Sequence, residues 1–290
     1  MFSGVYPAII TPFKNYNIDF DGLKKNIEFL IENDVDGIVV VGTSGESPTL
    51  THDEHKEVIK KAVEFVDGRI KVIAGTGSNN TQEAIELSKF AEDVGVDAIL
   101  SVVPYYNKPT QEGLKKHFGT IAESVDLPII IYNIPTRCIV NMSVETAKYL
   151  SNEYSNIVAV KEANPNLSQV SELILETDLE VLSGNDELTL PILALGGKGV
   201  VSVIANILPK EMKELVYSAL NNNFEKAREI HYKLYPLMKA LFIETNPIPI
   251  KTAMNLLGFP AGELRSPLTE MKEENKEILK KALKDVGLLG

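Results

Sequence analysis

Ile157-Val158-Ala159-Val160-Lys161 is a short apolar run that ends in a lysine, and runs of this kind decide the expected fold. Seven similar runs are spread along the chain. Most are nearly continuous in apolar residues rather than alternating with polar ones, which is typical of parallel strands covered on their outer side. The eight predicted strands are Val5–Ile10, Gly37–Val41, Lys71–Ala74, Ala98–Val103, Ile129–Tyr132, Ile157–Lys161, Glu180–Ser183 and Gly199–Val203.

Helical patterns separate the predicted strands. Leu23, Ile27 and Leu30 recur at helical spacing and form an apolar stripe. Thr51-His52-Asp53-Glu54 is typical of a capping box that opens a helix. Eight strands, each followed by a helix, predict an α/β fold, a closed (β/α)8 TIM barrel. A doubly wound open sheet is the main structural alternative.

The chain becomes purely helical after the eighth strand. The predicted helices are Pro209–Asn222, Phe224–Ala240, Pro249–Leu257 and about Glu270–Val286. Only the first of them is needed to complete a barrel. We therefore expect a barrel catalytic domain over residues 1–223 and a C-terminal helical region, residues 224–290, packed on it.

Composition narrows the class of protein. The net charge of −11 argues against a nucleic-acid partner, because such proteins neutralise phosphates with a basic face. No apolar stretch approaches the roughly 18 residues that span a bilayer, and Met1–Val5 lacks the features of a signal peptide. The single cysteine, Cys138, fits a reducing compartment. We expect a cytoplasmic protein without a membrane partner.

Lys161 is the most informative residue, because barrel active sites lie at the C-terminal ends of the strands. Strand alternation places Lys161 on the same face as Ile157 and Ala159, opposite Glu162. If that face is the apolar interior, burial lowers the lysine pKa from about 10.4 to about 7–8 and supplies the neutral amine that an imine requires. An ion pair with a barrel carboxylate, or a lysine that extends to solvent, is the alternative.

Two neighbouring strand ends offer groups that suit such chemistry. Tyr132 ends the strand before Lys161, and a phenol can move protons during imine formation, although it can equally be a core tyrosine. Thr43 and Ser44 lie in the turn Gly42-Thr43-Ser44-Gly45-Glu46. Glycine allows backbone N–H groups to approach a carboxylate closely, and an ordinary strand-to-helix turn is the alternative.

With these strand ends in view, the chain resembles the dihydrodipicolinate synthase/N-acetylneuraminate lyase family over essentially its whole length. The motifs that carry the resemblance are Gly4–Phe13, Gly42–Ser47, Pro104–Pro109, Tyr132–Pro135, Val160–Ala163, Gly199–Ser202 and Asn246–Pro249. Several ordered motifs in one chain are more specific than any single motif. The resemblance implies a (β/α)8 barrel with a C-terminal helical region, a homotetramer (a dimer of dimers), and pyruvate bound covalently as an imine.

The resemblance also assigns roles to residues. Lys161 matches the lysine that forms the imine, and Tyr132 matches the tyrosine that relays protons. Thr43 matches the threonine that links this tyrosine to a second one, Tyr106, which in the family reaches into the neighbouring subunit's site. Thr43 and Ser44 match the pair that holds the pyruvate carboxylate, with Ser44 replacing the more usual threonine. No further cofactor and no metal are implied.

Arg137 decides the expected substrate. In the synthases of this family an arginine at this position binds the carboxylate of L-aspartate 4-semialdehyde, a role that suits a planar guanidinium. A solvated loop arginine is the alternative. Val201 matches a backbone position in the pocket, and Cys138-Ile139 stand where Thr-Gly is common. The implied activity is condensation of pyruvate with the semialdehyde to 4-hydroxy-tetrahydrodipicolinate, in diaminopimelate and lysine biosynthesis.

Two other functions stay open at this point. Another pyruvate-dependent aldolase, which cleaves N-acetylneuraminate or a 2-keto-3-deoxy sugar acid, is the first. A non-catalytic barrel that senses a small ligand is the second, and the joint presence of Lys161, Tyr132, Thr43 and Tyr106 argues against it.

His52-Asp53-Glu54-His55 resembles a metal-binding cluster, but no third ligand is evident and a solvated helix start is favoured. The family suggests another role. Some of its synthases are inhibited by lysine at a subunit interface, and Pro48 replaces an alanine often found there. The residues that match the lysine contacts are Ser47, His52, His55, Asn79, Glu83 and Tyr105.

Overall fold

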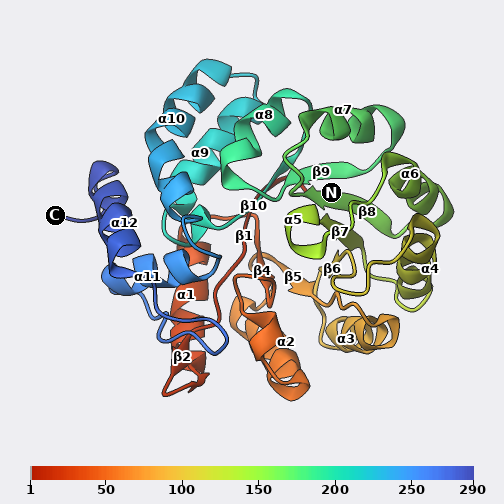
Figure 1. The fold of residues 1–290 in the computed structure, drawn as a ribbon, viewed down its shortest axis with the longest axis horizontal. Helices are drawn as coiled ribbons and strands as arrows, with labels where there is room; N and C mark the ends of the chain where they lie inside the picture. The colour runs from red at the N-terminus through yellow and green to blue at the C-terminus, as the bar shows by residue number, and fades with distance from the viewer. Residues whose placement is uncertain (1) are drawn as a thin grey trace.

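The structure, a computed structural model, describes residues 2–290. Its centre is a barrel of eight parallel strands, with helices around the outside (Figure 1). The strands of the barrel are β1 Gly4–Pro7, β4 Gly37–Val40, β5 Lys71–Gly75, β6 Ala98–Val102, β7 Ile129–Asn133, β8 Ile157–Glu162, β9 Glu180–Ser183 and β10 Gly199–Ser202. Neighbouring strands pair in the order β1-β10-β9-β8-β7-β6-β5-β4.

The two ends of that order, β1 and β4, meet and close the barrel. Ala8 pairs in parallel with Val39, and the backbone N–H of Ile9 donates to the carbonyl oxygen of Val39 at 3.0 Å. An open sheet would leave these two edges apart. The predicted (β/α)8 barrel is therefore confirmed, and the open-sheet alternative is wrong.

All eight predicted strands form, each within a few residues of its expected bounds. β1 ends at Pro7 rather than Ile10, because the chain then turns into a small antiparallel hairpin that the sequence did not suggest. Its strands are β2 Phe13–Lys14 and β3 Asn17–Ile18. Asn15 and Tyr16 join them with φ angles of 51° and 60°, as a tight two-residue hairpin turn requires.

Helices follow the strands as predicted. Those around the barrel are α1 Phe20–Glu32, α2 His52–Val66, α3 Thr81–Asp93, α4 Gln111–Ala122, α5 Pro135–Cys138, α6 Val144–Glu153, α7 Leu167–Glu176, α8 Thr189–Ala194 and α9 Pro209–Leu220. The capping box at the start of α2 is present: the Thr51 hydroxyl accepts from the Glu54 N–H, and the Glu54 carboxylate accepts from the Thr51 N–H. Short 3-10 turns, η1 Ser47–Thr49, η2 Asp186–Leu188 and η3 Ile204–Asn206, lie in loops after the strands.

The last three helices are α10 Phe224–Ala240, α11 Ile248–Leu256 and α12 Glu273–Asp285. They pack on the β1–β10 side of the barrel, since Val5 and Val200 belong to the same buried cluster as Leu234 and Leu283. In Figure 1 they form the blue group on the left, with α10 packed against α9 and α12. The division at residue 223 stays a prediction, because this apolar core is continuous across it. No helix within residues 2–290 is long and apolar enough to cross a membrane.

A bulge at the start of β8 leaves the functional end of the strand in register. Ile129 pairs with Ile157 and Ile130 pairs with Ala159, so one residue of β8 is passed over there. Beyond the bulge, the Cα of Tyr132 lies opposite that of Lys161. The ends of β7 and β8 therefore place these two side chains next to each other.

Candidate active site

Lys161 lies inside the C-terminal mouth of the barrel and is only 6% exposed. Its ammonium nitrogen Nζ is 3.7 Å from the centroid of the Tyr132 ring. Burial lowers the pKa of Lys161 to about 7; the nearby Asp186 carboxylate opposes this shift and the Arg137 guanidinium adds to it. Among residues 2–290, no carboxylate forms an ion pair with Lys161. In about half of the molecules the Lys161 amine is therefore neutral at pH 7.

Lys161 lines a cavity of about 330 Å³, within the range of small-molecule sites. Its walls come from the ends of strands and the loops that follow them. The sequence-predicted residues in its lining are Thr43, Ser44, Tyr132, Arg137, Lys161 and Val201. Six of the seven residues predicted for catalysis or substrate binding thus surround one space. The seventh, Tyr106, is 88% exposed and is not in this lining.

Tyr132 is buried, and a hydrogen bond joins its hydroxyl to the Thr43 side chain. Burial raises the pKa of Tyr132 to about 12, although Arg137 and the bond from Thr43 oppose the shift. The phenol therefore keeps its proton at neutral pH. Glycine is required in the turn that carries Thr43, because a Cβ on Gly45 would lie 2.9 Å from the Cα of Val41.

The segment before α11 completes the cavity wall. Arg137 Nη2 donates to the Thr245 hydroxyl at 3.2 Å and to the Asn246 carbonyl oxygen at 3.1 Å. The Asn246 side-chain Nδ2 donates to the Ser44 hydroxyl at 3.0 Å. Asn246 Oδ1 is buried and finds no hydrogen-bond partner in the described part of the chain. Asn246 thus links two of the predicted substrate-binding residues, a link that the sequence pattern did not indicate.

The polar segment after β9 also contributes to the cavity, although it was not among the residues predicted for the site. Asp186 is buried, and its Oδ2 accepts from the backbone N–H groups of Val203 and Ile204, both at 2.9 Å. Burial raises the pKa of Asp186. Asn185 and Glu187, on either side of it, line the cavity. The signal was present, since three polar residues, Asn185-Asp186-Glu187, come just after the predicted strand Glu180–Ser183, at the catalytic end of the barrel.

A comparison with models of known protein families shows to which family this chain belongs. The family model described as the dihydrodipicolinate synthetase family matches residues 1–286. The chain belongs to this family.

Relatives within the dihydrodipicolinate synthetase family are similar over the whole chain. A protein of Methanocaldococcus jannaschii, named 4-hydroxy-tetrahydrodipicolinate synthase, is 71% identical over 289 residues and covers 100% of both chains. A crystal structure of dihydrodipicolinate synthase from Aquifex aeolicus is 54% identical and covers 99% of both chains, with a TM-score of 0.98. A crystal structure of the Cyanidioschyzon merolae protein with lysine bound is 43% identical and covers 99% of both chains, with a TM-score of 0.97.

A second cavity of about 430 Å³ adjoins the first in this member of the dihydrodipicolinate synthetase family. Both cavities are lined by Thr43, Tyr132 and Arg137. Of the residues predicted to form a lysine site, Ser47, His52, His55, Glu83 and Tyr105 lie in the lining of the second cavity. Asn79 is not in this lining; its carbonyl oxygen accepts from Asn107 Nδ2 at 2.8 Å.

The histidines of the second cavity have protein partners. His52 Nε2 lies against the Glu83 carboxylate, and His55 Nε2 lies 2.8 Å from the carbonyl oxygen of Gly75. Burial lowers the pKa of His55. Within residues 2–290, no group of three or more His, Cys, Asp or Glu side chains is arranged to hold a metal ion.

Proposed function

We propose that this protein condenses pyruvate with L-aspartate 4-semialdehyde to form 4-hydroxy-tetrahydrodipicolinate, as a lyase of diaminopimelate and lysine biosynthesis. The observation that carries the proposal is Lys161, a buried amine with a pKa of about 7 beside a protonated phenol. The name of the 71% identical relative supports the same reaction. An assay of product formation from pyruvate and the semialdehyde tests it, and turnover of a sialic acid or sugar acid instead would favour the other lyases.

The first half of the reaction uses the wall of the cavity formed by β4, β7 and β8. Neutral Lys161 attacks the ketone of pyruvate, and loss of water leaves an imine. The Tyr132 hydroxyl, held by Thr43, passes the protons that this addition and dehydration require. The Thr43–Ser44 turn binds the pyruvate carboxylate through N–H and hydroxyl groups. The pyruvate methyl group then loses a proton to give an enamine.

The second half joins the two substrates. The enamine carbon attacks the aldehyde, and the amine of the semialdehyde then displaces Lys161 as the ring closes. Arg137 lines the cavity and presents its guanidinium to the carboxylate of the semialdehyde. The reaction needs no cofactor beyond the covalently bound substrate.

Replacing Arg137 with alanine is expected to lower kcat/KM for the semialdehyde about 10–100-fold, because a charged hydrogen bond contributes roughly 1.5–3 kcal/mol. The KM for pyruvate should stay within about twofold, since the Thr43–Ser44 turn holds that substrate. Steady-state kinetics with each substrate varied in turn measure both effects. Arg228→Ala, at an exposed arginine on α10, is the control. Equal losses for both substrates would remove Arg137 from its proposed role.

The rate of imine formation is expected to rise with pH through the pKa of Lys161. Raising the pH deprotonates the amine, so the neutral fraction goes from about a tenth at pH 6 to about nine-tenths at pH 8. kcat/KM for pyruvate should therefore increase about tenfold over this range and then level off. Initial rates at limiting pyruvate provide the profile. A flat profile, or a rise that begins only above pH 9, would contradict the proposed state of Lys161.

We also propose that L-lysine inhibits the enzyme from the second cavity. The five matching residues meet in one space there, and that space shares a wall with the catalytic cavity. Saturating L-lysine is expected to lower initial rates, and Glu83→Gln is expected to relieve the inhibition because Glu83 pairs with the effector's ammonium group. Glu86→Gln, on the same helix but exposed, is the control. Unchanged rates in L-lysine would remove this proposal.

The assembly and location stay predictions. We propose a homotetramer, a dimer of dimers, in which the exposed Tyr106 of one subunit reaches the site of its neighbour. We propose further that the enzyme acts in the cytoplasm and binds neither nucleic acid nor membranes.

A further inference from the structure

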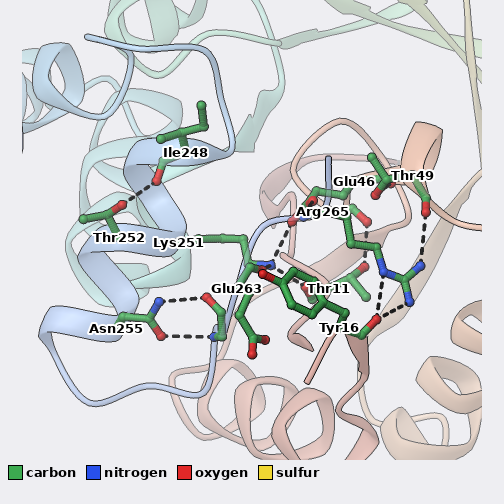
Figure 2. Close-up of polar contacts among 12 residues, drawn as sticks. Thr11, Tyr16, Glu46, Thr49, Ile248, Lys251, Thr252, Asn255, Glu263 and Arg265 are labelled. Atoms are coloured by element: carbon green, nitrogen blue, oxygen red, sulfur yellow. Dashed lines mark hydrogen bonds and ion pairs between the residues drawn. The ribbon is translucent and has the colours of Figure 1, made fainter. Parts of the chain in front are cut away.

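A second buried lysine, Lys251 on α11, lies close to the proposed active site but outside it. It is 1% exposed, and its Nζ lies 2.8 Å from Oε1 of Glu46, which is also fully buried. Nζ donates in addition to the carbonyl oxygens of Thr11, at 3.1 Å, and Glu263, at 2.5 Å. The ammonium group has three hydrogens and three acceptors, so it is fully satisfied (Figure 2).

The ion pair extends into a larger cluster. The other carboxylate oxygen of Glu46 accepts from the backbone N–H of Arg265 at 3.1 Å. The Arg265 guanidinium forms two hydrogen bonds to Glu54, at 2.6 and 2.7 Å. The Phe13 ring lies 4.3 Å from Lys251 Nζ and 4.3 Å from the centre of the Arg265 guanidinium. The Glu46–Lys251 pair thus joins three separate parts of the chain: the loop after β1, the loop after β4 and the C-terminal region.

The two residues of the Glu46–Lys251 ion pair are close in sequence to residues on two different walls of the cavity. Glu46 is two residues after Ser44, in the turn proposed to bind the pyruvate carboxylate. Lys251 lies in the first turn of α11, five residues after Asn246. Asn246 bonds to the Ser44 hydroxyl and, through its carbonyl oxygen, to Arg137. The ion pair and the Asn246–Ser44 bond are thus two cross-links between the same two segments.

Stability alone is a weak reason for such a pair. Removing two charges from water is costly, and buried ion pairs can often be replaced by apolar residues without loss of stability. A buried pair does define position, because each charge is strongly disfavoured anywhere but beside its partner. This argument points to placement of the turn rather than to the free energy of folding.

We propose that the Glu46–Lys251 pair positions the carboxylate-binding end of the cavity, by fixing the Thr43–Ser44 turn against Asn246 at the start of α11. This inference rests on the proposed function for the identity of the substrate. Glu46 and Lys251 are positioning residues: neither lines the cavity around Lys161. Loss of the pair should therefore weaken pyruvate binding more than it slows the chemical steps.

Two variants test the proposal. Lys251→Met removes the ammonium group, and the double variant Glu46→Gln with Lys251→Met also avoids an unpaired buried charge. In both we expect the KM for pyruvate to rise about tenfold or more, with a smaller change in kcat, because small displacements of binding groups are costly. Borohydride trapping on Lys161 should fall at low pyruvate and recover at saturating pyruvate. Leu283→Ala, in the core of α12, is the control for general destabilisation, and its KM should be unchanged.

A folded double variant with wild-type KM for pyruvate would overturn the proposal. If neither variant folds, amide hydrogen exchange in the wild-type protein decides: pyruvate is expected to slow exchange in residues 247–256 as well as in 42–50. Protection confined to 42–50 would overturn the proposal. Failure of the proposed function is distinguishable, because the wild-type protein would then either form no pyruvate adduct or form the adduct without condensing it with the semialdehyde.

Discussion

Replacing Lys161 with methionine is expected to lower kcat/KM for the condensation by at least about 10³-fold, because no imine can form without the amine. Methionine follows the lysine side chain out to Cε and fills most of the same apolar space. The free energy of unfolding is expected to stay equal or rise, since a buried amine without an ion-pair partner is replaced by an apolar group. Steady-state kinetics and thermal unfolding measure the two effects.

The matched control for this experiment is Lys89→Met, at an exposed lysine on α3. It replaces a lysine by a methionine at a position away from the cavity. The activity of this variant should therefore match that of the wild-type protein. A Lys161→Met variant that kept a tenth of the wild-type activity would show that the reaction proceeds without a covalent intermediate on this residue.

Tyr132→Phe is expected to lower kcat by about 10²–10⁴-fold, the usual contribution of a positioned acid or base. The substitution removes the hydroxyl and its bond to Thr43 but keeps the ring that lies against Lys161. Borohydride trapping of pyruvate should therefore become slower without being lost. The measurement is kcat at saturating concentrations of both substrates.

Tyr149→Phe, which removes the hydroxyl of an exposed tyrosine on α6, is the control for the loss of a tyrosine hydroxyl away from the cavity. A Tyr132→Phe variant with kcat within threefold of the wild-type value would assign Tyr132 to packing alone. Such a result would leave the role of Lys161 intact, so the two substitutions test separate parts of the mechanism.

The barrel could be predicted because its signals are local. Continuous Val and Ile runs such as Ile129–Ile131 mark buried parallel strands, and the capping box at Thr51 marks a helix start. The hairpin of β2 and β3 could not be predicted, since strands of two residues have no hydrophobic periodicity. The same applies to α5, which is only four residues long.

Some features of the candidate site could likewise be predicted from the sequence, and others could not. Lys161, Tyr132 and Thr43 were identified because they lie at the ends of predicted strands or in the turn that follows one, and because they belong to ordered motifs. The bond from Asn246 to Ser44 joins residues 202 positions apart, and the Glu46–Lys251 pair spans 205, so neither leaves a pattern in the sequence. The role of Tyr106 needs a second subunit and stays a prediction.

The central claim is that Lys161 carries pyruvate as an imine, and reduction with borohydride in the presence of pyruvate tests it most directly. After digestion and mass spectrometry, the peptide that contains Lys161 is predicted to bear an N-(1-carboxyethyl) group on that lysine. Omission of pyruvate or of borohydride should leave the peptide unmodified. An unmodified Lys161, or an adduct on Lys251 instead, would contradict the account.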